Sequence, residues 1–78
     1  MTKIAERIEA DPKILGGKPT IRGLRISAEQ VLKALAAGTP QEELLKEYPE
    51  LEPEDIQAAL AYAAGLVAEE RILPIKAG

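Results

Sequence analysis

Through the last two thirds of the chain, apolar residues recur at the three- and four-residue intervals of an amphipathic helix. A first helix is predicted over residues 28–37, with Ser27 as its N-cap and Gly38 as the residue that ends it. A second helix is predicted to follow at once, with Thr39 as its N-cap and Pro40 at its first position. The two helices are therefore expected to be joined by a tight turn.

A third helix is predicted from Pro53 to about residue 70, after Pro49 has ended the second. Its first turn carries Glu54 and Asp55, which suit the positive end of a helix dipole. Apolar residues then fall at intervals of four, three and four, and predict one buried stripe formed by Ile56, Leu60, Ala63 and Val67.

Before Ser27 the helical spacing is absent, and Gly and Pro punctuate short β-branched segments. Residues 3–8 and 20–26 are predicted as short strands or extended arms joined by turns. In the second segment Gly23 is expected to form a bulge, and the buried side is expected to consist of Ile21, Leu24 and Ile26.

The expected fold is mostly α, a small α+β domain in which a short β-hairpin or extended arm precedes three helices. Residues 1–26 form the basic, turn-rich β-arm and residues 27–78 the three-helix unit of one single domain. Three short helices with brief connections are typical of the helix-turn-helix cores of DNA-binding domains. A three-helix unit that only packs a core is the alternative.

Composition argues against an enzyme. The 78 residues include no Cys and no His, and Ser27 is the only serine, so thiol chemistry, a Ser–His–Asp triad and the common metal sites are excluded. Paired acidic residues remain, but two of the three pairs begin helices, and no cofactor or metal is expected. No signal peptide and no membrane span are recognised, so a cytoplasmic location is expected. Abundant Ala, Leu and Glu without Asn is typical of a thermophile.

The formal net charge of −3 is the sum of two unlike parts. Residues 1–26 carry six basic and three acidic side chains, whereas residues 27–78 carry four basic and ten acidic ones. A basic end suggests an anionic partner such as DNA, and Lys18, Arg22 and Arg25 are the candidate phosphate contacts. The alternative for these basic residues is ordinary surface charge. The adjacent Gly16-Gly17 weakly resembles a phosphate-binding loop, and the alternative for it is a plain turn.

The third helix is poorly suited to recognise DNA bases in the major groove. Carboxylates occupy its first turn, and Gln57 is the one side chain there with an amide that can hydrogen-bond a base. Near the C-terminus three apolar residues surround Pro74, and they are candidate partner-binding residues: Ile72, Leu73 and Ile75. Folding back over the small core is the alternative for them. A thin aliphatic core with uncovered apolar faces predicts a homo-oligomer, a dimer.

Three motifs resemble a family of small prokaryotic proteins catalogued as domain of unknown function 433. They are Gly-Gly-Lys-Pro at residues 16–19, Arg-Gly-x-Arg-Ile at residues 22–26, and Tyr-Pro followed by Glu-Asp-Ile within residues 48–56. The resemblance covers about residues 4–74. It implies a homeodomain-like, three-helix fold with a helix-turn-helix. This chain departs from the family pattern at Leu24, where Thr is usual, and at Glu52, where Thr or Ser is common.

Members of that family look like antitoxins encoded beside a small PIN-like nuclease. The resemblance therefore implies a non-enzymatic antitoxin-like protein that binds a PIN-like toxin and also its operator DNA. The alternative hypothesis is a dimeric DNA-binding transcription regulator without a toxin partner. Both are hypotheses about binding, in keeping with the missing catalytic residue types.

Overall fold

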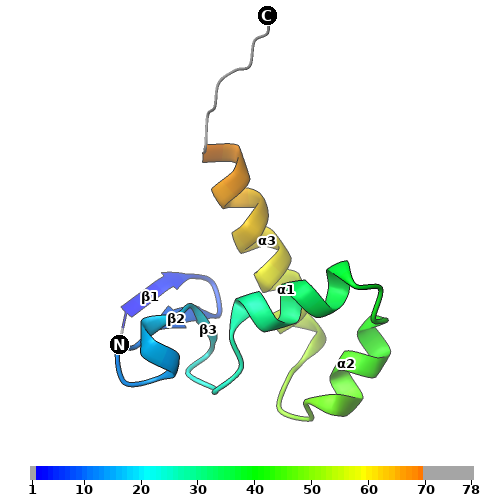
Figure 1. Ribbon diagram of the computed structural model, residues 1–78. Helices are drawn as coiled ribbons and strands as arrows, with labels where there is room; N and C mark the ends of the chain where they lie inside the picture. The colour runs from blue at the N-terminus through cyan, green and yellow to red at the C-terminus, as the bar shows by residue number, and fades with distance from the viewer. Residues whose placement is uncertain (1, 70–78) are drawn as a thin grey trace, which may run out of the picture.

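A computed structural model describes residues 2–69 and confirms a small α+β fold, with a three-stranded antiparallel sheet ahead of three helices (Figure 1). The strands lie in the order β1-β2-β3, and a short 3-10 turn, η1, precedes the third. The elements are β1 Thr2–Ala5, β2 Ile8–Ala10, η1 Leu15–Gly17, β3 Thr20–Ile21, α1 Ala28–Ala36, α2 Gln41–Glu47 and α3 Pro53–Glu69.

Both predicted strands are wrong in length, because a turn interrupts each. The segment 3–8 reverses at Arg7, whose backbone is left-handed at φ 64°, so β1 and β2 form a hairpin instead of one strand. The segment 20–26 is a strand only at Thr20–Ile21, after which Arg22 (φ 46°) and Gly23 (φ 76°) turn the chain. Gly23 therefore serves a turn and not a bulge.

The first helix begins and ends nearly where the sequence predicts. The Ser27 hydroxyl accepts a hydrogen bond from the Gln30 N–H at 2.9 Å and caps α1. At the other end Gly38 takes φ 95°, and the N–H of Thr39 donates to the Ala34 carbonyl at 3.0 Å, which closes a Schellman motif. The helix ends at Ala36, one residue earlier than predicted.

The second helix starts one residue later than predicted. Pro40, not Thr39, occupies the N-cap position of α2, and no side chain caps that end. The ring of Pro40 fixes φ at −66°, while ψ of 149° keeps the residue outside the helix. The third helix begins at Pro53, as predicted.

Aliphatic side chains from the sheet and all three helices meet in one core. Nine apolar residues of the described part of the chain are buried there, which are Ile8, Ile21, Ile26, Ala28, Val31, Leu44, Leu51, Ile56 and Ala59. The buried stripe predicted for α3 is wrong at Leu60, which is 42% exposed, and at Val67, which is 75% exposed, whereas Ala63 is partly buried. Instead Asp55, Ile56 and Ala59 turn inward.

The sheet and α2 lie at opposite ends of α1, and α3 crosses behind α1 before its last turns stand clear of the other elements (Figure 1). Within residues 2–69, no helix is both long and apolar enough to cross a membrane.

Candidate functional site

A fully buried carboxylate is the most unusual group in the molecule. Asp55 lies in the first turn of α3, three residues after Glu52, and is 0% exposed. Its Oδ2 accepts a hydrogen bond from the backbone N–H of Glu52 at 2.8 Å. This is half of a capping box, so the side chain satisfies an N–H that the helix start leaves without a partner.

Two arginines from the N-terminal turns complete the site. Arg22 donates through Nε to Oδ1 of Asp55 at 2.8 Å and through Nη2 to Oδ2 at 2.9 Å. Arg7 donates through Nη1 to Oδ1 at 2.8 Å and also pairs with Glu52 at 2.9 Å. Each carboxylate oxygen thus accepts two hydrogen bonds, which uses every lone pair. We call Arg7, Arg22, Glu52 and Asp55 the carboxylate clasp.

The local backbone explains how the arginines reach a residue so far along the chain. Arg7 and Arg22 each occupy the left-handed region, at φ 64° and φ 46°, and each follows a strand. The N–H of Arg22 donates to the carbonyl of Arg7 at 2.9 Å, which holds the two turns together. Nη2 of Arg22 also donates to the Glu50 carbonyl at 2.9 Å, in the segment that leads into α3.

Electrostatics in the clasp favour the charged forms. Burial by itself raises the pKa of Asp55, but hydrogen bonds from Arg22, Arg7 and the Glu52 N–H outweigh burial and lower this pKa to about 2. The same contacts raise the pKa of both guanidinium groups. Two positive and two negative side chains balance, so the cluster is neutral as well as saturated.

The clasp holds three segments of the chain together, and its contacts leave the Asp55 carboxylate with no free lone pair for acid–base chemistry. A general base needs a free lone pair to accept a proton and a pKa that is not strongly lowered. Asp55 meets neither requirement, because all its lone pairs accept hydrogen bonds and its pKa is about 2. Among residues 2–69, no group of three or more acidic side chains has metal-binding geometry. The clasp joins the β1–β2 turn and the turn after β3 to the start of α3.

Two of the residues predicted to contact nucleic acid are paired with carboxylates of this chain. Arg22 is committed to the clasp, and Lys18 pairs with Glu29 at 2.8 Å. Arg25 is exposed. Gln57 is also exposed and lines a shallow hollow with acidic neighbours, Glu6 and Glu54.

The glycine pair forms a turn, since the N–H of Gly17 donates to the Ile14 carbonyl at 3.0 Å within η1. The predicted partner-binding residues of the C-terminal segment, Ile72, Leu73 and Ile75, lie outside the described residues.

Sequence reasoning missed the clasp because it assigned Asp55 to the helix dipole. The partners of Asp55 lie 48 and 33 residues away, at Arg7 and Arg22. The capping-box spacing between Glu52 and Asp55 was the one available signal, and it accounts for a single hydrogen bond.

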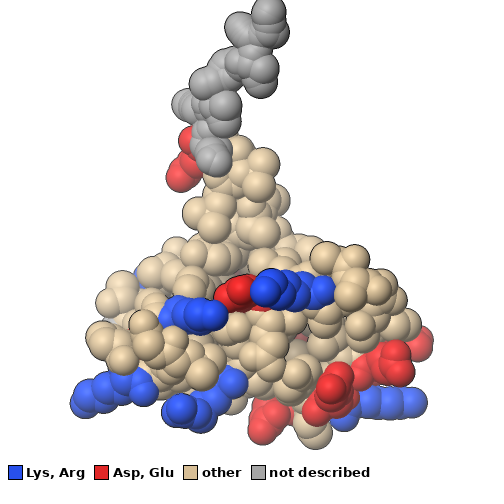
Figure 2. All heavy atoms as spheres, viewed as in Figure 1, with Lys and Arg blue, Asp and Glu red and all other residues tan. Residues whose placement is uncertain are grey.

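The charges on the face seen in Figure 2 are partly separated by sign. Acidic side chains gather over α2 at the lower right, with a basic side chain beside them, and basic side chains lie at the lower left, over the strand end. The exposed acidic residues of α2 are Glu42, Glu43 and Glu47, and exposed basic residues of the strand end include Lys3, Lys13 and Arg25. The charge asymmetry of the sequence is therefore also an asymmetry in space.

Comparison with known proteins identifies the family. The model of the family described as "Protein of unknown function (DUF433)" matches residues 8–63. The chain belongs to DUF433. The matched DUF433 segment runs from β2 into α3 and contains Arg22 and Asp55, and Arg7 lies one residue before it.

Two individual proteins are similar to this DUF433 chain. An uncharacterized protein of Sinorhizobium fredii, y4eO, is 40% identical over 58 residues, which are 74% of this chain and 26% of the relative. The chain thus spans about a quarter of that relative's length. The crystal structure of a DUF433 member protein from Anabaena variabilis superposes with a TM-score of 0.73 at 33% identity, covering 81% of this chain and 62% of that one.

Proposed function

We propose that this DUF433 chain is not an enzyme and acts by binding, as the antitoxin-like partner of a PIN-like nuclease. The observation that carries the proposal is the carboxylate clasp. It consumes Asp55, the one buried carboxylate among residues 2–69, and leaves Arg7 and Arg22 in structural contacts. What the chain then offers to other molecules is its surface, on which acidic side chains gather over α2.

Charge supports a nuclease as the protein partner. A nuclease must attract the phosphates of its substrate, so its substrate-binding face is electropositive. The exposed carboxylates of α2, Glu42, Glu43 and Glu47, complement such a face and add long-range attraction to whatever apolar contacts form.

Co-expression with the reading frame next to its gene tests this function. We expect the two proteins to purify together and the nuclease to be inactive until they separate. Glu42→Gln, Glu43→Gln and Glu47→Gln in combination should weaken binding and reduce its salt dependence. The control neutralises two exposed carboxylates outside α2, Glu6 and Glu54, and should bind as wild type. A nuclease that stays free and active in the mixture contradicts the proposal.

A second candidate, a DNA-binding transcription regulator, is favoured by the basic side chains at the strand end. Its test leaves out Arg22, because removing that side chain breaks the clasp. Lys13→Ala, Lys18→Ala and Arg25→Ala together should abolish a shift of the protein's own promoter DNA, with a smaller salt slope. Lys46→Ala, on α2, is the control and should bind normally. No binding of that DNA by wild type at low salt excludes this candidate.

A further inference from the structure

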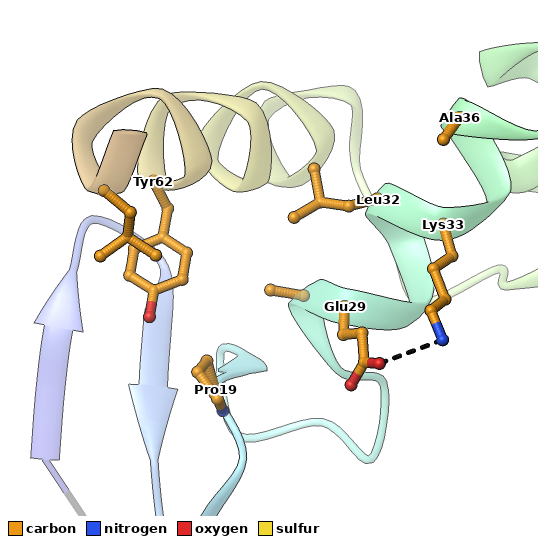
Figure 3. A pocket seen from close by; sticks show the side chains of 8 residues that line it. Pro19, Glu29, Leu32, Lys33, Ala36 and Tyr62 are labelled. Carbon is orange, nitrogen blue, oxygen red and sulfur yellow. Dashed lines mark ion pairs between the residues drawn. The ribbon is translucent and has the colours of Figure 1, made fainter. Parts of the chain in front are cut away.

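An apolar groove of about 450 Å³ runs between α1 and the middle of α3. In Figure 3 Leu32 points from α1 toward α3, and Tyr62 hangs from α3 toward Pro19. Glu29 and Lys33, joined by an ion pair of 3.2 Å, stand on α1 at the mouth of the groove. The other lining residues are Ala28, Ala36 and Leu66. The groove is thus an apolar slot with charge on one rim.

Next to this groove, α3 projects beyond the rest of the molecule (Figure 1). Two large apolar side chains of its last turns are exposed, Leu66 by 52% and Val67 by 75%. A methyl group added at Gly65 would meet nothing within 4 Å, so the backbone is accessible there. The molecule therefore presents an apolar slot and an apolar helix end side by side.

Helix geometry places these features on one face. At about 100° per residue, Tyr62, Leu66 and Glu69 lie at i, i+4 and i+7 and continue the wall of the groove along α3. By the same geometry Val67 lies about 100° and Leu60 about 120° away from Leu66. These two exposed residues belong to another face of the helix.

We propose that the groove binds the last turns of α3 from a second copy of this chain, antiparallel to its own α3. The arrangement is self-complementary, as a two-fold interface requires, because each copy supplies a groove and a helix end. An axis between Tyr62 and Leu66 sets Leu66 of each copy over Tyr62 of the other. Gly65 lets the two helix backbones approach closely.

Charge complementarity selects a second copy as the occupant. Between Asp55 and Glu69 no residue of α3 is charged, and the last turn within residues 53–69 carries Glu69 and no basic residue. Lys33, with a side chain 77% exposed, stands at the groove mouth. Antiparallel packing brings Glu69 of one copy toward Lys33 of the other, twice in each dimer.

Sedimentation equilibrium of the full chain at micromolar concentration tests the inference. We expect wild type to be a dimer and Leu66→Glu to raise the dissociation constant by about 30-fold or more, as loss of a hot spot does. Val67→Glu is the matched control, because it puts the same charge on the adjacent, more exposed residue of the other face. It should dimerise like wild type, and circular dichroism should show equal helix content in both variants.

Exchange of the charged pair tests the direction of packing. Lys33→Glu and Glu69→Lys should each weaken the dimer, and the double variant should restore it. A wild-type monomer at these concentrations overturns the proposal. So does a Val67→Glu variant whose dimer dissociates as readily as that of Leu66→Glu, or a double variant whose dimer is weaker than those of both single variants. A Leu66→Glu variant that still forms a dimer also overturns the proposal. If that dimeric variant no longer binds the nuclease, the groove is the binding site of the nuclease instead. The dimer does not depend on the proposed function.

Discussion

Replacing the buried carboxylate of the clasp by an amide should remove a large part of the protein's stability. Asp55→Asn keeps the shape of the side chain but removes its charge and turns two donors toward Arg7 and Arg22, which are donors themselves. The native pKa of Asp55, about 2 against an ordinary 3.8, corresponds to ~2 kcal/mol of stability at neutral pH. The mismatched donors add roughly 1 kcal/mol.

The expected loss is therefore ~3 kcal/mol, at the lower end of the range for breaking a buried ion pair. It is not larger because water reaches both guanidinium groups, whose side chains are 30% and 34% exposed. A chain of this length has a free energy of unfolding of roughly 4–12 kcal/mol, so the loss is a substantial fraction of the total.

Urea unfolding followed by circular dichroism measures the effect. With a slope of ~1 kcal/mol per molar urea, the midpoint of Asp55→Asn should fall by about 3 M. Glu54→Gln is the control, because Glu54 is exposed in the same helical turn and its loss costs only ~0.5 kcal/mol of dipole interaction. Equal midpoints for Asp55→Asn and Glu54→Gln would refute a stabilising role for the clasp.

Acid supplies an independent check on the same carboxylate. Because folding depresses the pKa of Asp55, its contribution is complete above the unfolded value near 3.8 and is lost as the pH falls through about 2. The stability difference between wild type and Asp55→Asn should therefore shrink by ~2 kcal/mol across that window. A difference that stays constant from neutral pH to pH 2 would show that the ionic contacts contribute nothing.

Three further stability measurements probe the helix ends and the core. Ser27→Ala should cost ~1 kcal/mol because Ser27 caps α1, whereas Thr39→Ala should cost less than ~0.5 kcal/mol because its side chain caps nothing; equal costs would contradict the two caps. Gly38→Ala should cost ~1 kcal/mol, since φ 95° disfavours a side chain. Leu44→Ala should lower the free energy of unfolding by ~3 kcal/mol and Leu60→Ala by less than ~1 kcal/mol, because the two side chains are 1% and 42% exposed. A larger loss for Leu60→Ala than for Leu44→Ala would contradict this assignment of the core.

The sequence predicted the helices well because their limits are set locally. Ser27, Gly38 and Pro53 each act within one turn of the chain, and all three mark a helix end in the structure. The start of α2 was off by one residue because Thr39 and Pro40 are both acceptable caps by residue type, and the backbone angles chose between them.

The spacing of apolar residues could not predict the buried face of α3 or the clasp. That reading treats every carboxylate as a surface residue, whereas Asp55 is turned inward by two arginines that no spacing rule connects to it. With Asp55 inside, α3 is rotated so that Ala59 and Tyr62 follow it inward, and Leu60 and Val67 are left in solvent. Long-range ion pairs therefore decided what the apolar pattern did not.

The separation of the clasp residues also sets the order in which the chain can assemble. Arg7 lies 48 residues before Asp55 and Arg22 lies 33 residues before it, so both leave the ribosome well ahead of their acceptor. Helices α1 and α2, whose caps are local, can form while synthesis continues. The hairpin closes onto α3 only after residue 55 has emerged, so the sheet stays without its anchor on α3 while α1 and α2 form.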